Sequence, residues 1–235
     1  MDYSHYAQLA ELFDFPGPDY HEQARRLRDL LAADYPEAAA ELQLFVDVIP
    51  KAANSLQELY TRTFEVQSLT TMGVGYVLFG DDYKRGDLLA NLNREHMAVN
   101  NDCRGELADH LPNVLRLVPL VTADEEMRNE LVKDLLLPAL TMIIKEFDPE
   151  RTAKKNANYA KHYKTLIDMP AGTDGTIYCR AFKATLLVLS QDFAVEPHSV
   201  AEIGTRHKGS DFLGMLEKEL EVEWTANPNN SGRDH

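Results

Sequence analysis

Apolar residues recur every three or four positions along most of the chain, which is the spacing of one helix face. Tyr6, Leu9 and Phe13 begin this pattern, and Leu27 belongs to the next stretch after a Phe-Pro-Gly-Pro break at 15–18. The sequence therefore predicts helices at residues 6–13, 20–31, 36–49, 56–66, 83–99, 111–118, 123–147, 149–167, 176–193 and 211–224.

Segment 67–82 interrupts the pattern with three glycines and a short apolar run. No second strand candidate is available to pair with that run, so we expect a short helix that ends at Gly80. Gly73 and Gly75 lack the flanking strand and third glycine of a nucleotide fingerprint. They predict a turn or a close contact between helices.

Local signals predict several helix ends. Thr122 and Glu125 have the spacing of a capping box, which would open the helix that follows. Pro138 predicts an interruption or kink within that helix, because a proline nitrogen donates no hydrogen bond. Asp148 followed by Pro149 predicts the start of the next helix.

These patterns together predict an all-α fold, a single-domain bundle of about eight to ten helices. The helical domain is expected over residues 1–224, with a disordered C-terminal tail at 225–235. A chain of 235 residues, of which 44% are hydrophobic, is large enough to bury one core.

The chain is strongly acidic, with 24 Lys and Arg against 38 Asp and Glu and a formal charge of −14. Such a surface repels nucleic acid and anionic lipid, and it attracts cationic ligands and peptides. The same charge would also serve solubility alone, and composition leaves both interpretations open.

The expected location is the cytoplasm. Cys103 and Cys179 stand far apart and outside any metal-binding spacing, so they indicate neither a disulfide framework nor a zinc site. The first residues are acidic and amphipathic, unlike an export signal. No apolar run approaches the roughly 18 residues that a membrane span needs, so no stable membrane insertion is expected.

Known catalytic and nucleotide-binding motifs are missing from the sequence, and neither a resident cofactor nor a metal is expected. Asp109 and His110, within the segment 106–112, admit three interpretations. Asp109 can cap the following helix, the pair can bind a ligand, or it can act as an acid–base pair. An enzyme is the weakest of the three, because no nucleophile or oxyanion donor accompanies the pair.

Segment 79–87 is the second group of candidate residues. It places Asp81, Asp82 and Asp87 beside an apolar run, which is an arrangement that can bind a cationic group. It can equally be a helix connection with aspartate caps, glycines at positive φ and Arg85 in a local ion pair.

Three motifs in this order resemble one protein family: ELYTRTFE at 58–65, YVLFGDDYKRGDLLANL at 76–92 and ELADHLPNVLRLV at 106–118. They are similar to the NarJ branch of the TorD/DmsD/NarJ redox-enzyme maturation chaperones, also called nitrate reductase delta subunits. The family's Gly-Asp-x-x-x-Arg-Gly turn matches Gly80, Asp81, Arg85 and Gly86. Its Glu-Leu-Pro-Asp-His-Leu-Pro motif matches 106–112, except that Ala108 replaces a proline.

This resemblance implies a cytoplasmic, all-helical chaperone without enzyme activity, either a monomer or a domain-swapped dimer. Its partner would be the N-terminal, signal-like peptide of the catalytic subunit of a molybdopterin-dependent oxidoreductase. The chaperone would hold that subunit until the molybdenum cofactor is inserted, before membrane attachment or export. The alternative is a small helical structural subunit that stays in the mature oxidoreductase complex.

A peptide with a basic start and an apolar stretch needs an apolar groove with carboxylates at its rim. The residues predicted to form this peptide-binding site are Phe64, Leu78, Phe79, Asp81, Arg85, Glu106, Asp109 and His110. Phe64, Leu78 and Phe79 are the expected walls, and Asp81, Glu106 and Asp109 are the expected cation-binding groups. Asp109 and His110 come from the family motif, and the groove residues are inferred from their chemistry.

Overall fold

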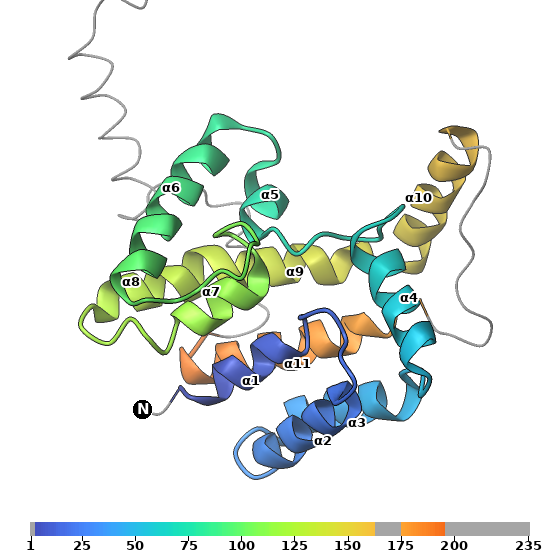
Figure 1. Ribbon diagram of the computed structural model, residues 1–235, viewed down its shortest axis with the longest axis horizontal. Helices are drawn as coiled ribbons and strands as arrows, with labels where there is room; N and C mark the ends of the chain where they lie inside the picture. Colours follow the sequence, from blue (N-terminus) through green and yellow to red (C-terminus); the bar gives the residue numbers. More distant parts are fainter. Residues whose placement is uncertain (1–2, 163–174, 196–235) are drawn as a thin grey trace, which may run out of the picture.

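The computed structural model describes residues 3–162 and 175–195 of the chain (Figure 1). Within these ranges it contains ten helices and no strand, when the continuous run 125–146 is counted as one helix. The prediction of an all-α bundle is confirmed. The elements are α1 (His5–Glu11), α2 (Tyr20–Leu31), α3 (Pro36–Val48), α4 (Ala53–Phe64), α5 (Val74–Phe79), α6 (Tyr83–Ala98), α7 (Leu111–Leu117), α8 (Glu125–Glu130), the π-helical turn η1 (Leu131–Leu136), α9 (Leu137–Glu146), α10 (Pro149–His162) and α11 (Tyr178–Asp192).

Some predicted elements lie outside the described residues. These are the helix at 211–224, the tail at 225–235 and the end of the helix at 149–167. No helix in the described ranges has both the length and the apolar composition needed to cross a bilayer.

Helix α11 lies at the centre of the bundle, where it packs against α3 and α9 (Figure 1). Helix α1 runs beside it, and the rings of Phe13 and Phe182 stack 4.7 Å apart between the two. On either side, α2 covers α3 and α7 packs against α1. The central helix is therefore surrounded by elements from both halves of the chain, and it is buried on most faces as its sequence predicts.

The apolar stripes read from the sequence are the buried faces of the helices. In α2, the residues Tyr20, Ala24, Leu27 and Leu31 are all buried, at the predicted spacing. Burial of one such large side chain contributes about 1.5–3 kcal/mol. The bundle is held together mainly by these stripes, because short helices are marginal in isolation.

Two predicted details of the run 125–146 have different outcomes. The capping residue is Asp124 and not Thr122, because the Asp124 carboxylate accepts a hydrogen bond from the Met127 amide at 2.9 Å. The interruption expected near Pro138 is present as η1, which ends two residues before the proline. A π-helical turn is one way for a helix to continue where a proline nitrogen cannot donate a hydrogen bond.

A corner between α5 and α6 prepares one part of the candidate site. The short helix α5 ends at Gly80 as predicted, and the φ of Gly80 is 64°, a value that suits glycine. The Asp82 side chain then caps α6 by accepting from the Lys84 amide at 3.0 Å.

Backbone hydrogen bonds join the start of α5 to the segment before α7. Val74 donates to the Asp109 carbonyl at 2.9 Å, and Leu111 donates to the Met72 carbonyl at 2.8 Å. These bonds form around an antiparallel bridge between Gly73 and His110. Two of the three motifs that suggested a family are therefore bonded to each other in space.

Candidate functional site

The loop between α6 and α7 is fixed by three buried or half-buried polar side chains. His96 donates from Nε2 to the Ala108 carbonyl at 3.0 Å, and its Nδ1 accepts from the Asn101 amide at 2.8 Å. Asn113 donates to the carbonyls of Cys103 and Leu107 at 3.2 and 3.0 Å. Because both ring nitrogens of His96 are used in this way, the imidazole is neutral, and burial lowers its pKa.

Asp109 lies inside the molecule, at the junction of this loop with the α5–α6 corner. Its side chain has 0% exposure and binds Arg85, with 2.9 Å between Arg85 Nε and Asp109 Oδ2. The Arg85 guanidinium also lies over the Tyr76 ring, 5.2 Å from its centroid. The predicted contact of Asp109 with a peptide is therefore corrected, because its carboxylate is internal and already has a cationic partner.

The capping interpretation of Asp109 is also corrected. The N-cap residue of α7 is His110, and no side chain caps that helix. Arg85 does form an ion pair, but its partner lies 24 positions away and is not local.

Gly75 makes the close contact that the glycine pair predicted. A Cβ atom at Gly75 would lie 2.8 Å from Asp109 Oδ2 and 2.8 Å from Leu88 Cδ2. A side chain at this position would push into the buried ion pair. The glycine lets α5 approach the Asp109 carboxylate and α6 at the same time.

A cavity of about 500 Å³ opens on the other side of the 103–110 loop, and we call it the Phe15 cavity. Its lining comes from the end of α1 and the turn after it, the start of α2, the last turn of α4, the loop and α7. Phe15 keeps 54% exposure and meets the Tyr60 ring edge to face, with 5.4 Å between centroids. Cavities of this size are large enough to hold a side chain or a small ligand.

The walls of the Phe15 cavity are acidic. Asp14 binds two guanidinium groups of the chain itself, Arg116 and, at 3.3 Å, Arg104. Four further carboxylates line the cavity without an ion-pair partner among the described residues: Glu11, Asp19, Glu65 and Glu106. The cavity therefore combines an exposed aromatic ring with a surplus of negative charge.

The carboxylates act together on one buried hydroxyl in this cavity. Burial raises the pKa of Tyr60 most, and the neighbouring Tyr178 raises it further. Glu65, Asp14 and Glu106 each add to the same upward shift. Three carboxylates from different segments of the chain are thus close enough to influence the same group.

His110 lines the Phe15 cavity and not the Arg85 junction. Burial lowers the pKa of its imidazole, and this outweighs the carboxylates of Glu106, Asp14 and Asp109, which raise that pKa. The side chain is accordingly neutral at pH 7. The adjacent Asp109 and His110 belong to two different environments, separated by the loop that carries both.

The predicted site residues are found in three places. Glu106 and His110 line the Phe15 cavity, together with residues that the sequence analysis did not select. Phe64 packs edge to face against Tyr60 and against Tyr178 of α11, with 4.9 Å between centroids in each pair. It lies behind the cavity wall and does not form an exposed groove wall.

The remaining predicted residues belong to the α5–α6 corner. Leu78 and Phe79 are half-buried against the core, and Asp81 is exposed. These side chains line neither of the two cavities described here. The cavity residues that sequence reasoning missed include Phe15 and Tyr60, and the one available signal was the Phe-Pro-Gly-Pro turn, which exposes its aromatic residue.

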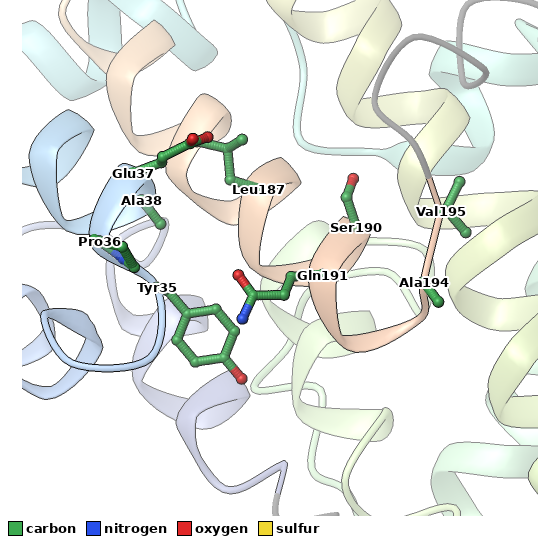
Figure 2. A pocket seen from close by; sticks show the side chains of 9 residues that line it. All are labelled: Tyr35, Pro36, Glu37, Ala38, Leu187, Ser190, Gln191, Ala194 and Val195. Carbon is green, nitrogen blue, oxygen red and sulfur yellow. The ribbon is translucent and has the colours of Figure 1, made fainter.

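A second cavity, of about 440 Å³, lies between the start of α3 and the end of α11 (Figure 2). Tyr35 lines it, and the Tyr35 hydroxyl donates to the buried Asp192 carboxylate at 2.6 Å. His5 and Tyr6 of α1 bond to the same carboxylate at 3.0 and 2.7 Å. None of the predicted site residues lines this cavity.

Burial alone would raise the pKa of Asp192. The hydrogen bonds from His5, Tyr35 and Tyr6 outweigh that effect and hold the pKa of this carboxyl below its usual value. The group joins the first helix to the last described helix, which is a structural role.

No known family model matches the chain, and no curated protein matches it either. The family suggested by the three motifs therefore stays a prediction. In the described part of the chain, no group of three or more His, Cys, Asp or Glu side chains is arranged to hold a metal ion.

Proposed function

We propose that this protein is a chaperone that binds a cationic and apolar N-terminal peptide of another protein. The observation that carries the proposal is the Phe15 cavity, where an exposed aromatic ring stands among carboxylates without ion-pair partners in the described residues. A peptide that begins with basic residues and continues with apolar ones complements both features.

The charge of the whole chain supports the same ligand class. A formal charge of −14 accelerates the encounter with a basic peptide at low ionic strength. Exposed charges lose much of this effect in salt, whereas contacts with Phe15 and its neighbours persist. Binding to the cavity should therefore depend on salt without disappearing in salt.

The motif resemblance suggests which protein supplies the peptide. Chaperones of the NarJ type bind the catalytic subunit of a molybdopterin-dependent oxidoreductase, and we propose a partner of this class. In that role the protein would act in the cytoplasm and hold the subunit until the molybdenum cofactor is inserted, before membrane attachment or export. It would require no cofactor of its own.

Calorimetric titration with synthetic N-terminal peptides of such catalytic subunits tests the proposal. We expect micromolar or tighter affinity that weakens at high salt but persists. Glu106→Gln should weaken binding about three- to tenfold, since it removes one exposed charge from the cavity. The matched control Glu126→Gln removes one exposed charge from α8, outside the cavity lining, and should leave the affinity within twofold.

Two results would contradict this function. No heat with any peptide at any salt concentration would remove the peptide-binding role. Co-purification of the chain with fully cofactor-loaded oxidoreductase would instead favour a structural subunit of the mature complex.

A further inference from the structure

We propose that the Phe15 cavity is a selective subsite for an arginine side chain, in preference to lysine. This deepens the proposed function, on which it rests only for the idea that the natural ligand is a peptide. The cavity itself can be tested with single blocked amino acids.

The cavity wall already binds guanidinium groups. Asp14 accepts from both Arg104 and Arg116, so the chain's own arginines show which cation this wall accommodates. Arg116 is the inner of the two, with 11% side-chain exposure, and Arg104 is 61% exposed. The arrangement resembles a bound ligand supplied by the chain itself.

Room and charge remain for another guanidinium group. The cavity measures about 500 Å³ with both arginines in place. Glu106 and Glu65 still lack an ion-pair partner in the described residues, and they approach the same Tyr60 hydroxyl. A planar guanidinium can donate to two carboxylates at once, whereas an ammonium is a single point of charge.

Phe15 supplies the second element of selectivity. Its ring is 54% exposed at the cavity, on the turn between α1 and α2. A guanidinium stacks flat on an aromatic face, and an ammonium has no planar surface with which to do so. A cation–π contact at such an exposed site corresponds to about a two- to fivefold gain in affinity.

Nuclear magnetic resonance titration of the full chain with acetylarginine amide, acetyllysine amide and acetylcitrulline amide tests this inference. Citrulline keeps the shape of arginine and removes its charge. We expect the backbone amides of Phe15 and Glu106 to shift, with the dissociation constant lowest for arginine, about two- to fivefold higher for lysine and highest for citrulline.

Two variants separate the aromatic contribution from charge. Phe15→Leu keeps an apolar side chain and should reduce arginine affinity to the level of lysine. Tyr83→Leu removes an exposed aromatic side chain from the α5–α6 corner and should leave the preference for arginine unchanged. Glu106→Gln should weaken arginine and lysine alike.

Equal affinities for arginine and lysine would overturn the inference, and so would a preference that survives Phe15→Leu or is lost in Tyr83→Leu. Absence of shifts at the cavity amides with acetylarginine amide would also overturn it. Failure of the proposed function gives a different result, since oxidoreductase peptides would then not bind even though arginine amide shifts the cavity residues.

Discussion

At the residue scale, the environment of Asp109 is the most informative feature of the motif 106–112. A carboxylate without exposed surface is tolerated because Arg85 Nε lies 2.9 Å from it and neutralises its charge. The pair is weak evidence for net stabilisation, since removing two charges from water costs about as much as their attraction returns. Removing only one partner is costly, because the other charge stays buried alone.

We therefore expect Asp109→Asn to destabilise the fold by about 1–3 kcal/mol. The Arg85 side chain is 20% exposed, so water relieves part of the penalty. Urea unfolding followed by circular dichroism measures the change. Asp81→Asn, at an exposed position in the same corner, is the control and should change stability by less than about 0.5 kcal/mol. An Asp109→Asn variant as stable as the wild type would show that the ion pair is unimportant for the fold.

At the element scale, the approach of α5 to α6 depends on a glycine inside a helix. Glycine costs a helix about 1 kcal/mol relative to alanine, so helical propensity alone favours alanine at both Gly75 and Gly86. The two positions differ in their surroundings. A Cβ at Gly75 would collide with Asp109 and Leu88, whereas a Cβ at Gly86 meets nothing within 4 Å.

Gly75→Ala and Gly86→Ala should therefore change stability in opposite directions. We expect Gly75→Ala to lose about 1–3 kcal/mol through overpacking. Gly86→Ala should gain about 0.4–1 kcal/mol, because alanine restricts the unfolded chain and fits the exposed face of α6. Thermal unfolding of the two variants against the wild type checks both signs. A stabilised Gly75→Ala variant would mean that α5 can move away from Asp109 at little cost.

At the scale of the whole molecule, the buried polar groups join segments that are distant in sequence. Asp192 binds His5, 187 positions away, and thereby closes the bundle between its first helix and the last described one. The Phe15 cavity likewise draws residues from five segments. Histidines enclosed by this packing are held neutral, as the lowered pKa values of His96 and His110 indicate.

This enclosure predicts that acid destabilises the fold already near pH 6. An unfolded histidine takes up a proton around pH 6.5, whereas folded His96 and His110 resist it. The unfolded state then binds more protons, so the free energy of unfolding falls as the pH falls.

Replacing His110 by glutamine isolates one of these groups. Relative to the wild type, the His110→Gln variant should gain up to about 1 kcal/mol of stability between pH 7.5 and pH 5.5. Urea midpoints of the two proteins at both pH values give this difference. A difference independent of pH would mean that His110 titrates normally in the folded protein.

The helices could be predicted from the sequence because their signals are local. An apolar stripe such as the one in α2, and the glycine that ends α5, are set by neighbours within a few positions of each other. The close contact at Gly75 was also foreseen. The capping residue of α8 was not, since Thr122 and Asp124 both offered a suitable oxygen and the turn before the helix selected the second.

The sequence by itself determined the helical stripes, the acidic charge and the two segments in which candidate residues gather. Only the tertiary structure decided that Asp109 is internal and that Glu106 and His110 share a cavity with Phe15. The physical reason is the range of the interactions. Helix periodicity and caps act within about one turn, whereas burial, ion pairing and pKa values depend on which distant segments the packing brings together.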